Sequence, residues 1–144
     1  MSLAQLLAER DVRAVVMASA RLVDAQDWRA FADLFTEDAQ LTRPDGSLMQ
    51  GREAVYQAYA ARSPERLTQH VLSNHEVTWV DAHQALSRCL VLLWSGKRSD
   101  PAPSQGRPAD APQQLGEFVD TLVLTPMGWR IAHRQARFMF HRAN

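Results

Sequence analysis

The sequence lacks a surplus of charge of either sign. Its 144 residues contain 16 lysines and arginines and 16 aspartates and glutamates, so the formal net charge is 0. A chain without an overall basic field has no general attraction for nucleic acid or for an anionic membrane surface. We therefore expect neither of these partners.

Cysteine and long hydrophobic runs are also scarce. The one cysteine, Cys89, cannot form an intrachain disulfide, which suits a reducing cytoplasm. It has no flanking signature of a nucleophile, and a small buried core residue is its expected role. No apolar run approaches the length that spans a bilayer. Residues 1–16 mix acidic and basic side chains with apolar ones, unlike a signal peptide, so we expect a mature cytoplasmic protein.

Signatures of cofactor and metal binding are missing as well. The chain has no glycine-rich phosphate loop. Its five histidines show neither the helical i, i+4 pair nor the tight spacing of a common zinc site. The sequence therefore predicts no cofactor and no metal.

The first part of the chain has a helical pattern. Apolar residues recur at intervals of three and four between residues 3 and 23, which predicts a long helix. Asp27 is placed to cap a second helix over residues 28–35. A short strand, a turn at residues 44–46 and a return follow, and a third helix ends before Pro64. Residues 3–62 are thus expected to be mostly helical.

The second part has the period of two that is typical of strands. We predict long strands at residues 67–80, 85–96, 115–125 and 129–140. Residues 98–114 contain four of the seven prolines and should form an exposed, mobile loop. The order of elements predicts one α+β domain over residues 1–144, in which a curved antiparallel or mixed sheet wraps around three N-terminal helices. The concave face of such a sheet can hold a small-molecule pocket.

Alternation sorts the polar residues of the first long strand by face. His70 and Asn74 share one face, whereas His75 lies on the other, so the two histidines point apart in a regular strand. Asp24 follows the apolar stripe of the first helix. Periodicity alone favours an exposed Asp24 at the polar end of this helix, whereas a carboxylate near the stripe would have to be paired or functional.

Two further charged residues lie in predicted apolar rows. Asp120 shares its row with Phe118, and Arg134 shares one with Phe138. Asp120 could meet solvent near a strand end or lie in the interior, and Arg134 could then pair with it. For a single arginine, a surface position is the more common one.

Four blocks of the sequence resemble a known family. "LVDAQDWRAFADLFTEDAQL", "GREAVYQAY", "RLTQHVLSN" and "GEFVDTLVLTPMGWRIAHR" occur in the order found in the SnoaL-like family of the nuclear transport factor 2-like superfamily. The resemblance covers most of the chain outside the proline-rich loop. It implies a cone of three helices inside a strongly curved sheet, with a pocket at the open end.

The resemblance also implies site residues. Scytalone dehydratase and hexachlorocyclohexane dehydrochlorinase carry an Asp–His pair, which matches Asp24 in "VDAQDW" and His70 in "TQH". Asp120 matches a position that is commonly acidic in the family. A second histidine of scytalone dehydratase is replaced here by Trp94 or Ser95, and its tyrosine by Val23, so that particular activity is not expected. The predicted substrate-binding residues are Asp120, Phe118, Trp94, Asn74 and Arg134.

These residues lead to three functional hypotheses. An imidazole beside a carboxylate is a competent general base, which suits a cofactor-independent lyase or isomerase with His70 as base and Asp24 as its partner. The substrate would be a small hydrophobic or aromatic molecule. Alternatives are a small-molecule binding protein without turnover and a small structural subunit of an aromatic-ring dioxygenase. The resemblance also implies a homodimer formed through the outer face of the sheet.

Overall fold

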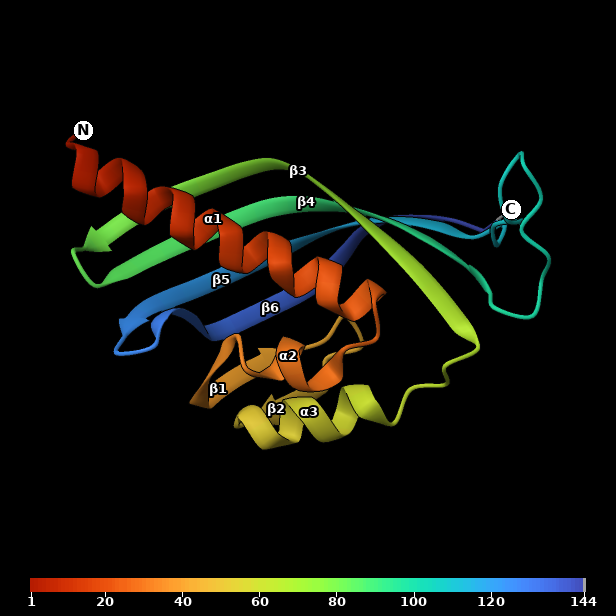
Figure 1. The fold of residues 1–144 in the computed structure, drawn as a ribbon, viewed down its shortest axis with the longest axis horizontal. Helices are drawn as coiled ribbons and strands as arrows, with labels where there is room; N and C mark the ends of the chain where they lie inside the picture. Colours follow the sequence, from red (N-terminus) through yellow and green to blue (C-terminus); the bar gives the residue numbers. More distant parts are fainter. Residues whose placement is uncertain (144) are drawn as a thin grey trace.

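The structure, a computed structural model, describes residues 1–143. Helices and short strands come first, and four long strands follow (Figure 1). The elements are α1 (Leu3–Asp24), α2 (Trp28–Ala32), β1 (Phe35–Thr42), β2 (Leu48–Gln50), α3 (Arg52–Ala60), β3 (Arg66–Asp81), β4 (Gln84–Lys97), β5 (Gln113–Thr125) and β6 (Gly128–Arg142).

The strands form one curved sheet in the order β2-β1-β6-β5-β4-β3. The sheet is mixed, because β1 runs parallel to β6 while every other pair is antiparallel. It is not closed, since β2 and β3 form its two edges. The long helix α1 crosses the face of the long strands, and α2 and α3 lie beside β1 and β2 (Figure 1). The predicted α+β fold, a curved mixed sheet around three N-terminal helices, is confirmed.

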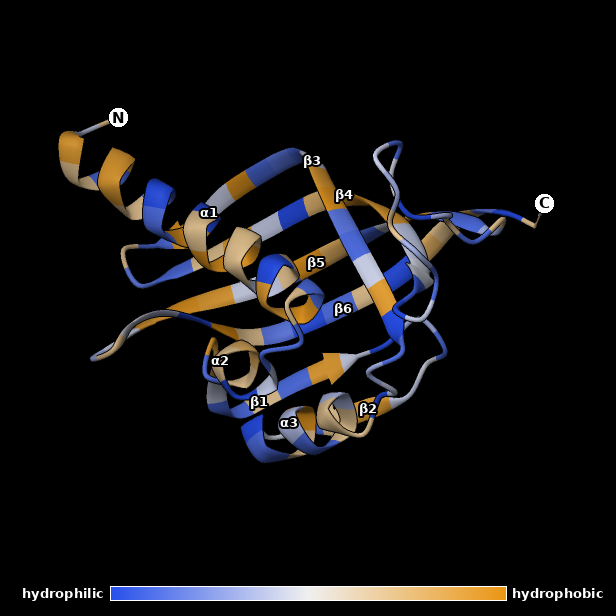
Figure 2. Ribbon diagram, turned by 45° about the vertical axis from the view of Figure 1, so that its right-hand side comes forward, coloured by the Kyte–Doolittle hydropathy of each residue, from blue (hydrophilic) through white to orange (hydrophobic). Residues whose placement is uncertain are grey.

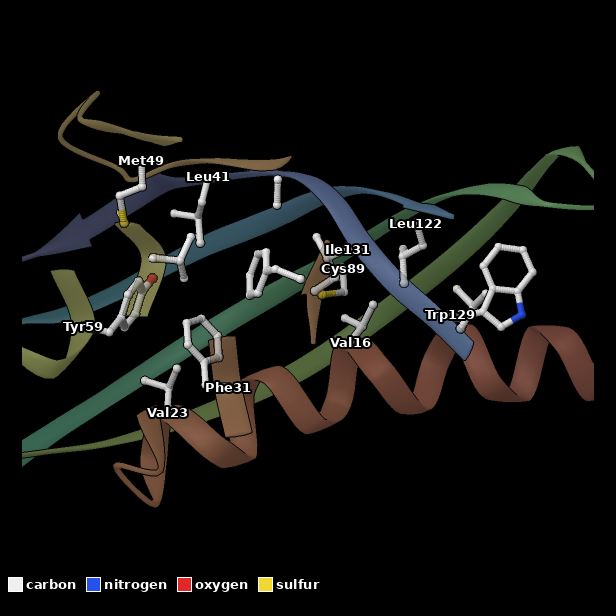
Figure 3. Packing of buried hydrophobic residues seen from close by; sticks show 14 of the residues in the cluster. Val16, Val23, Phe31, Leu41, Met49, Tyr59, Cys89, Leu122, Trp129 and Ile131 are labelled. Atoms are coloured by element: carbon white, nitrogen blue, oxygen red, sulfur yellow. The ribbon is translucent and has the colours of Figure 1, made fainter. Parts of the chain in front are cut away.

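The core lies between α1 and the inner face of the sheet. Ser2 caps α1 in a reciprocal capping box with Gln5, which stabilises the start of the helix. Val12, Val16 and Val23 then recur at helical spacing and are buried. Figure 3 shows the side chains of this cluster gathered between the helices and the strands. The apolar stripe read from the sequence is therefore what docks α1 onto the sheet.

The second helix is shorter than predicted. Asp27 caps it as expected, accepting a hydrogen bond from the Ala30 N–H at 3.2 Å. The helix spans only five residues, because the chain then joins the sheet. The Leu34 carbonyl accepts the Ile131 N–H at 2.8 Å, and Phe35 pairs with Ile131 in the parallel ladder with β6.

A β-bulge in β3 overturns one prediction from strand alternation. Asn74 has a positive φ of 50°, and the register of β3 against β4 shifts around it. The extra residue reverses the alternation, so His75 points to the inner side of the sheet rather than the outer. His75 Nε2 lies 2.7 Å from the hydroxyl of Ser87, which is buried in that interior. The prediction that His75 lies on the opposite face from His70 was wrong.

The proline-rich segment between β4 and β5 is anchored at several points. The Asp110 N–H donates to the Ser95 carbonyl at 2.8 Å, and Arg107 donates to the carbonyls of Lys97 and Arg98 at 3.1 and 2.9 Å. High mobility of residues 98–114 stays a prediction, to be checked by limited proteolysis.

The outer face of the sheet carries exposed apolar side chains. Apolar bands alternate with polar ones along the long strands (Figure 2). A homodimer through this face stays a prediction, which light scattering at micromolar concentration would check. The exposed outer-face residues include Val71, Leu86, Trp94 and Val119.

Among the described residues, no helix combines the length and the apolar character needed to cross a membrane.

Candidate active site

A cavity of about 480 Å³ lies between the helices and the inner face of the sheet. Its lining is mostly apolar but also includes His70 and several arginines. Pockets of this kind, with an apolar body and a few fixed polar groups, are typical of small-molecule sites. The apolar lining residues include Ala20, Val23, Trp28, Phe31, Tyr59, Val91, Leu93 and Phe118.

Asp24 and His70 meet at the wall of this cavity. Asp24 is the last residue of α1, and His70 lies on the inner face of β3. His70 Nδ1 is 2.5 Å from Asp24 Oδ1, and the His70 backbone N–H donates to Oδ2 at 2.9 Å. The hydroxyl of Thr68 donates to Oδ1 at 2.9 Å. The Asp24 side chain is only 10% exposed, so the view that it is a solvated helix end is wrong.

This arrangement fixes the imidazole of His70. A carboxylate at Nδ1 favours the tautomer with its proton on that nitrogen, which leaves a lone pair on Nε2. Within residues 1–143, no protein group forms a hydrogen bond with Nε2. The ring is 14% exposed and lines the cavity, with the ring of Phe118 at 6.4 Å between centroids. The geometry is therefore that of an oriented imidazole facing the cavity.

Asp120 and Arg134 form a buried ion pair in the same interior. They are directly paired across β5 and β6, and the guanidinium binds both carboxylate oxygens at 2.7 Å. Burial opposes the charge on Arg134, but Asp120 outweighs it and raises the pKa of the guanidinium above its ordinary value. Arg134 also lies 4.0 Å above the Phe118 ring and lines the cavity, whereas Asp120 lies behind it. Asp120 thus holds Arg134 in place instead of facing a ligand.

Besides Asp120, two of the predicted substrate-binding residues do not line the cavity. Asn74 is exposed and occupies the bulge of β3, so alternation misplaced it. Trp94 is 48% exposed and lies on the outer face, because Val91 and Leu93 take the inward positions of β4. Both placements predicted from the sequence were wrong.

Sequence reasoning missed three arginines of the cavity lining. Arg43, Arg62 and Arg66 all contribute to the lining. Arg66 could have been found, because it alternates with Thr68 and His70 on one face of β3. Arg43 and Arg62 lie in connections after β1 and α3, where no periodicity shows the direction of a side chain.

The other reactive side chains offer little to such a site. Among the described residues, no group of three or more histidines, cysteines, aspartates or glutamates could hold a metal ion. Cys89 is buried, and burial raises the pKa of its thiol to about 11. Because the thiolate is the nucleophilic form, this cysteine is inert near neutral pH.

Comparison with known proteins assigns the family. The SnoaL-like domain family matches residues 4–135. The chain belongs to this family. Among curated proteins, none matches the sequence of this SnoaL-like chain significantly. Its likeness to the solved structures described next, each at most 24% identical in sequence, shows the fold alone.

Three solved structures illustrate this likeness. A candidate scytalone dehydratase from Novosphingobium aromaticivorans is 21% identical with a TM-score of 0.84, over 100% of this chain and 92% of that one. A hexachlorocyclohexane dehydrochlorinase is 13% identical with a TM-score of 0.82, over 99% and 92%. A protein of unknown function from Mycobacterium tuberculosis is 24% identical with a TM-score of 0.75, over 94% and 73%.

Proposed function

We propose that this SnoaL-like protein is a cofactor-independent lyase or isomerase that removes a proton from a small hydrophobic or aromatic substrate. His70 is the general base, and Asp24 is the residue that orients it. The observation that carries the proposal is the 2.5 Å contact between His70 Nδ1 and Asp24 Oδ1 at the wall of a mostly apolar cavity. Dehydratases and dehydrochlorinases, two names found among the similar structures, denote eliminations.

The proposed step follows from the orientation of the imidazole. Nε2 of His70 takes a proton from a carbon next to an activating group, and the C–H electron pair forms a new π bond. In an elimination the leaving group departs with its own electron pair, whereas in an isomerisation the proton returns at another carbon. Asp24 stabilises the imidazolium that forms, because it already accepts the hydrogen bond from Nδ1.

Arg134 supplies a fixed positive charge to the same cavity. Its guanidinium is held by both oxygens of Asp120 and packs against Phe118, so it needs no reorganisation when a ligand enters. A charge fixed in advance within a buried site stabilises negative charge that develops in a transition state. We assign Arg134 this role toward the developing carbanion or the leaving group.

Turnover tests the proposal directly. Hexachlorocyclohexane is the first substrate to assay, with release of chloride as the readout. Exchange of substrate protons in deuterated water measures abstraction even where no product forms. His70→Ala and Asp24→Asn should each reduce the rate, by roughly 10²–10⁴-fold for loss of the base. His83→Ala is the matched control, because His83 lies in the exposed turn between β3 and β4 and outside the cavity.

Two results would contradict the proposal. One is an activity that survives His70→Ala. The other is a nitrogen NMR spectrum in which the proton of the neutral His70 ring resides on Nε2. If the cavity binds ligands but no proton exchange occurs, the protein is a small-molecule binding protein instead.

A further inference from the structure

Three arginines of the cavity lining have no carboxylate partner among residues 1–143. Arg43, Arg62 and Arg66 all line the cavity. Within residues 1–143, none of the three forms an ion pair. The chain as a whole has a net charge of 0, so this concentration of positive charge is a local feature.

The three side chains come from separate elements and line one cavity. Arg43 follows β1, and its Nε donates to the Ser47 hydroxyl at 3.1 Å. Arg62 follows α3, and its guanidinium lies 4.0 Å from the centre of the Tyr59 ring. Arg66 begins β3. Burial lowers the pKa of Arg62, and the charges of Arg43 and Arg66 lower it further, so both repel Arg62 in the absence of an anion.

The remaining charges of the lining do not neutralise this group. Arg134 is matched by Asp120, and Arg137 is matched by Glu117. The nearby Asp45 accepts hydrogen bonds from the Ser47 N–H and hydroxyl at 2.8 and 2.6 Å. These bonds within the turn, followed by the charge of Arg43, lower the pKa of Asp45. Asp45 already accepts hydrogen bonds within its own turn, so its single charge does not balance those of the three guanidinium groups.

We propose that Arg43, Arg62 and Arg66 bind the anionic group of the substrate, which is therefore a hydrophobic organic acid. Guanidinium groups suit this role, because they bind carboxylates through charge-assisted hydrogen bonds. The apolar body of the acid fills the cavity. This inference rests on the proposed function, in which the reacting carbon of the substrate lies beside His70.

The strand sets the distance between the two ends of the ligand. Arg66 and His70 lie on the same face of β3, four residues apart, so their Cα atoms are about 13 Å apart along the strand. Flexible arginine side chains shorten this span. The anionic group and the carbon that loses its proton therefore lie at opposite ends of the substrate, and the arginines select the ligand without entering the proton transfer.

Binding of a matched pair of ligands tests the proposal without any need for turnover. The probes are 2-naphthoate and its neutral counterpart 2-naphthamide, titrated by calorimetry at low salt. The wild type should prefer naphthoate. The variant Arg62→Gln/Arg66→Gln should bind naphthoate roughly tenfold more weakly or worse, with naphthamide unchanged, because charge-assisted hydrogen bonds are lost. The control Arg10→Gln/Arg142→Gln removes the same charge from exposed sites outside the cavity.

The preference should also persist in His70→Ala, so that loss of the catalytic base and loss of anion binding are separate results. Equal binding of the two naphthalene compounds by the wild type would overturn the proposal. So would an equal effect of the cavity pair and the control pair of substitutions, or an absence of saturable naphthoate binding at millimolar concentration. A rate lost in His70→Ala with no anion preference would leave the proposed reaction standing and refute the anionic substrate.

Discussion

Removal of Asp120 should destabilise the fold more than removal of any exposed carboxylate. Asp120→Ala leaves the guanidinium of Arg134 buried, only 3% exposed, without the two hydrogen bonds it now makes at 2.7 Å. Loss of one partner from a buried ion pair costs about 3–5 kcal/mol. For a chain of this size that corresponds to a fall in Tm of roughly 6–20 °C.

Urea denaturation followed by circular dichroism measures this change as a shift of the midpoint at constant slope. The double variant Asp120→Leu/Arg134→Met should recover much of the loss, since apolar residues of similar volume often replace a buried ion pair. Glu53→Ala is the control, because Glu53 and its partner Arg29 are exposed, and it should leave the midpoint almost unchanged. A cost for Asp120→Ala no larger than that of the control, or a double variant less stable than the single one, would refute the reasoning.

Three further outcomes are expected. Gly116→Ala should lower the free energy of unfolding by about 1–3 kcal/mol, because the added Cβ would collide with the Arg137 carbonyl; an unchanged Tm would contradict this. Cys89 should react with iodoacetamide far more slowly in the folded protein than in urea, because its thiol pKa is raised to about 11; equal rates would count against its burial. Burial, with help from the charge of Arg13, lowers the pKa of His75, so protonation favours the unfolded chain. The free energy of unfolding should therefore fall as the pH drops below about 6.5, the ordinary pKa of histidine, and His75→Gln should flatten that fall.

The parts of the fold that follow from local pattern could be predicted from the sequence. The stripe of Val12, Val16 and Val23 gives the direction of α1, and Asp27 marks the start of α2. The end of α2 could not be found this way, because the pairing of Phe35 with Ile131 is a contact between distant parts of the chain. The helical spacing of apolar residues continues to Phe35, although this residue already belongs to β1.

The candidate site shows the same division. His70 and Phe118 lie where alternation and resemblance placed them, at the cavity. Beyond the bulge at Asn74 the alternation reverses, so a rule that was sound at His70 failed for His75. The pairing of Asp24 with His70 came only from resemblance, because no periodicity connects the end of a helix to a strand more than forty residues away.

The contact between the end of α1 and the start of β3 allows local opening of the structure to be followed by hydrogen exchange. The backbone amide of His70 donates to Asp24, so its protection from hydrogen exchange depends on a side chain of the helix and not on a neighbouring strand. Any opening that lifts α1 from the sheet exposes this amide and separates the imidazole from its carboxylate at the same moment. The exchange rate of a single proton would therefore measure how often the contact between Asp24 and His70 opens, in the absence of any substrate.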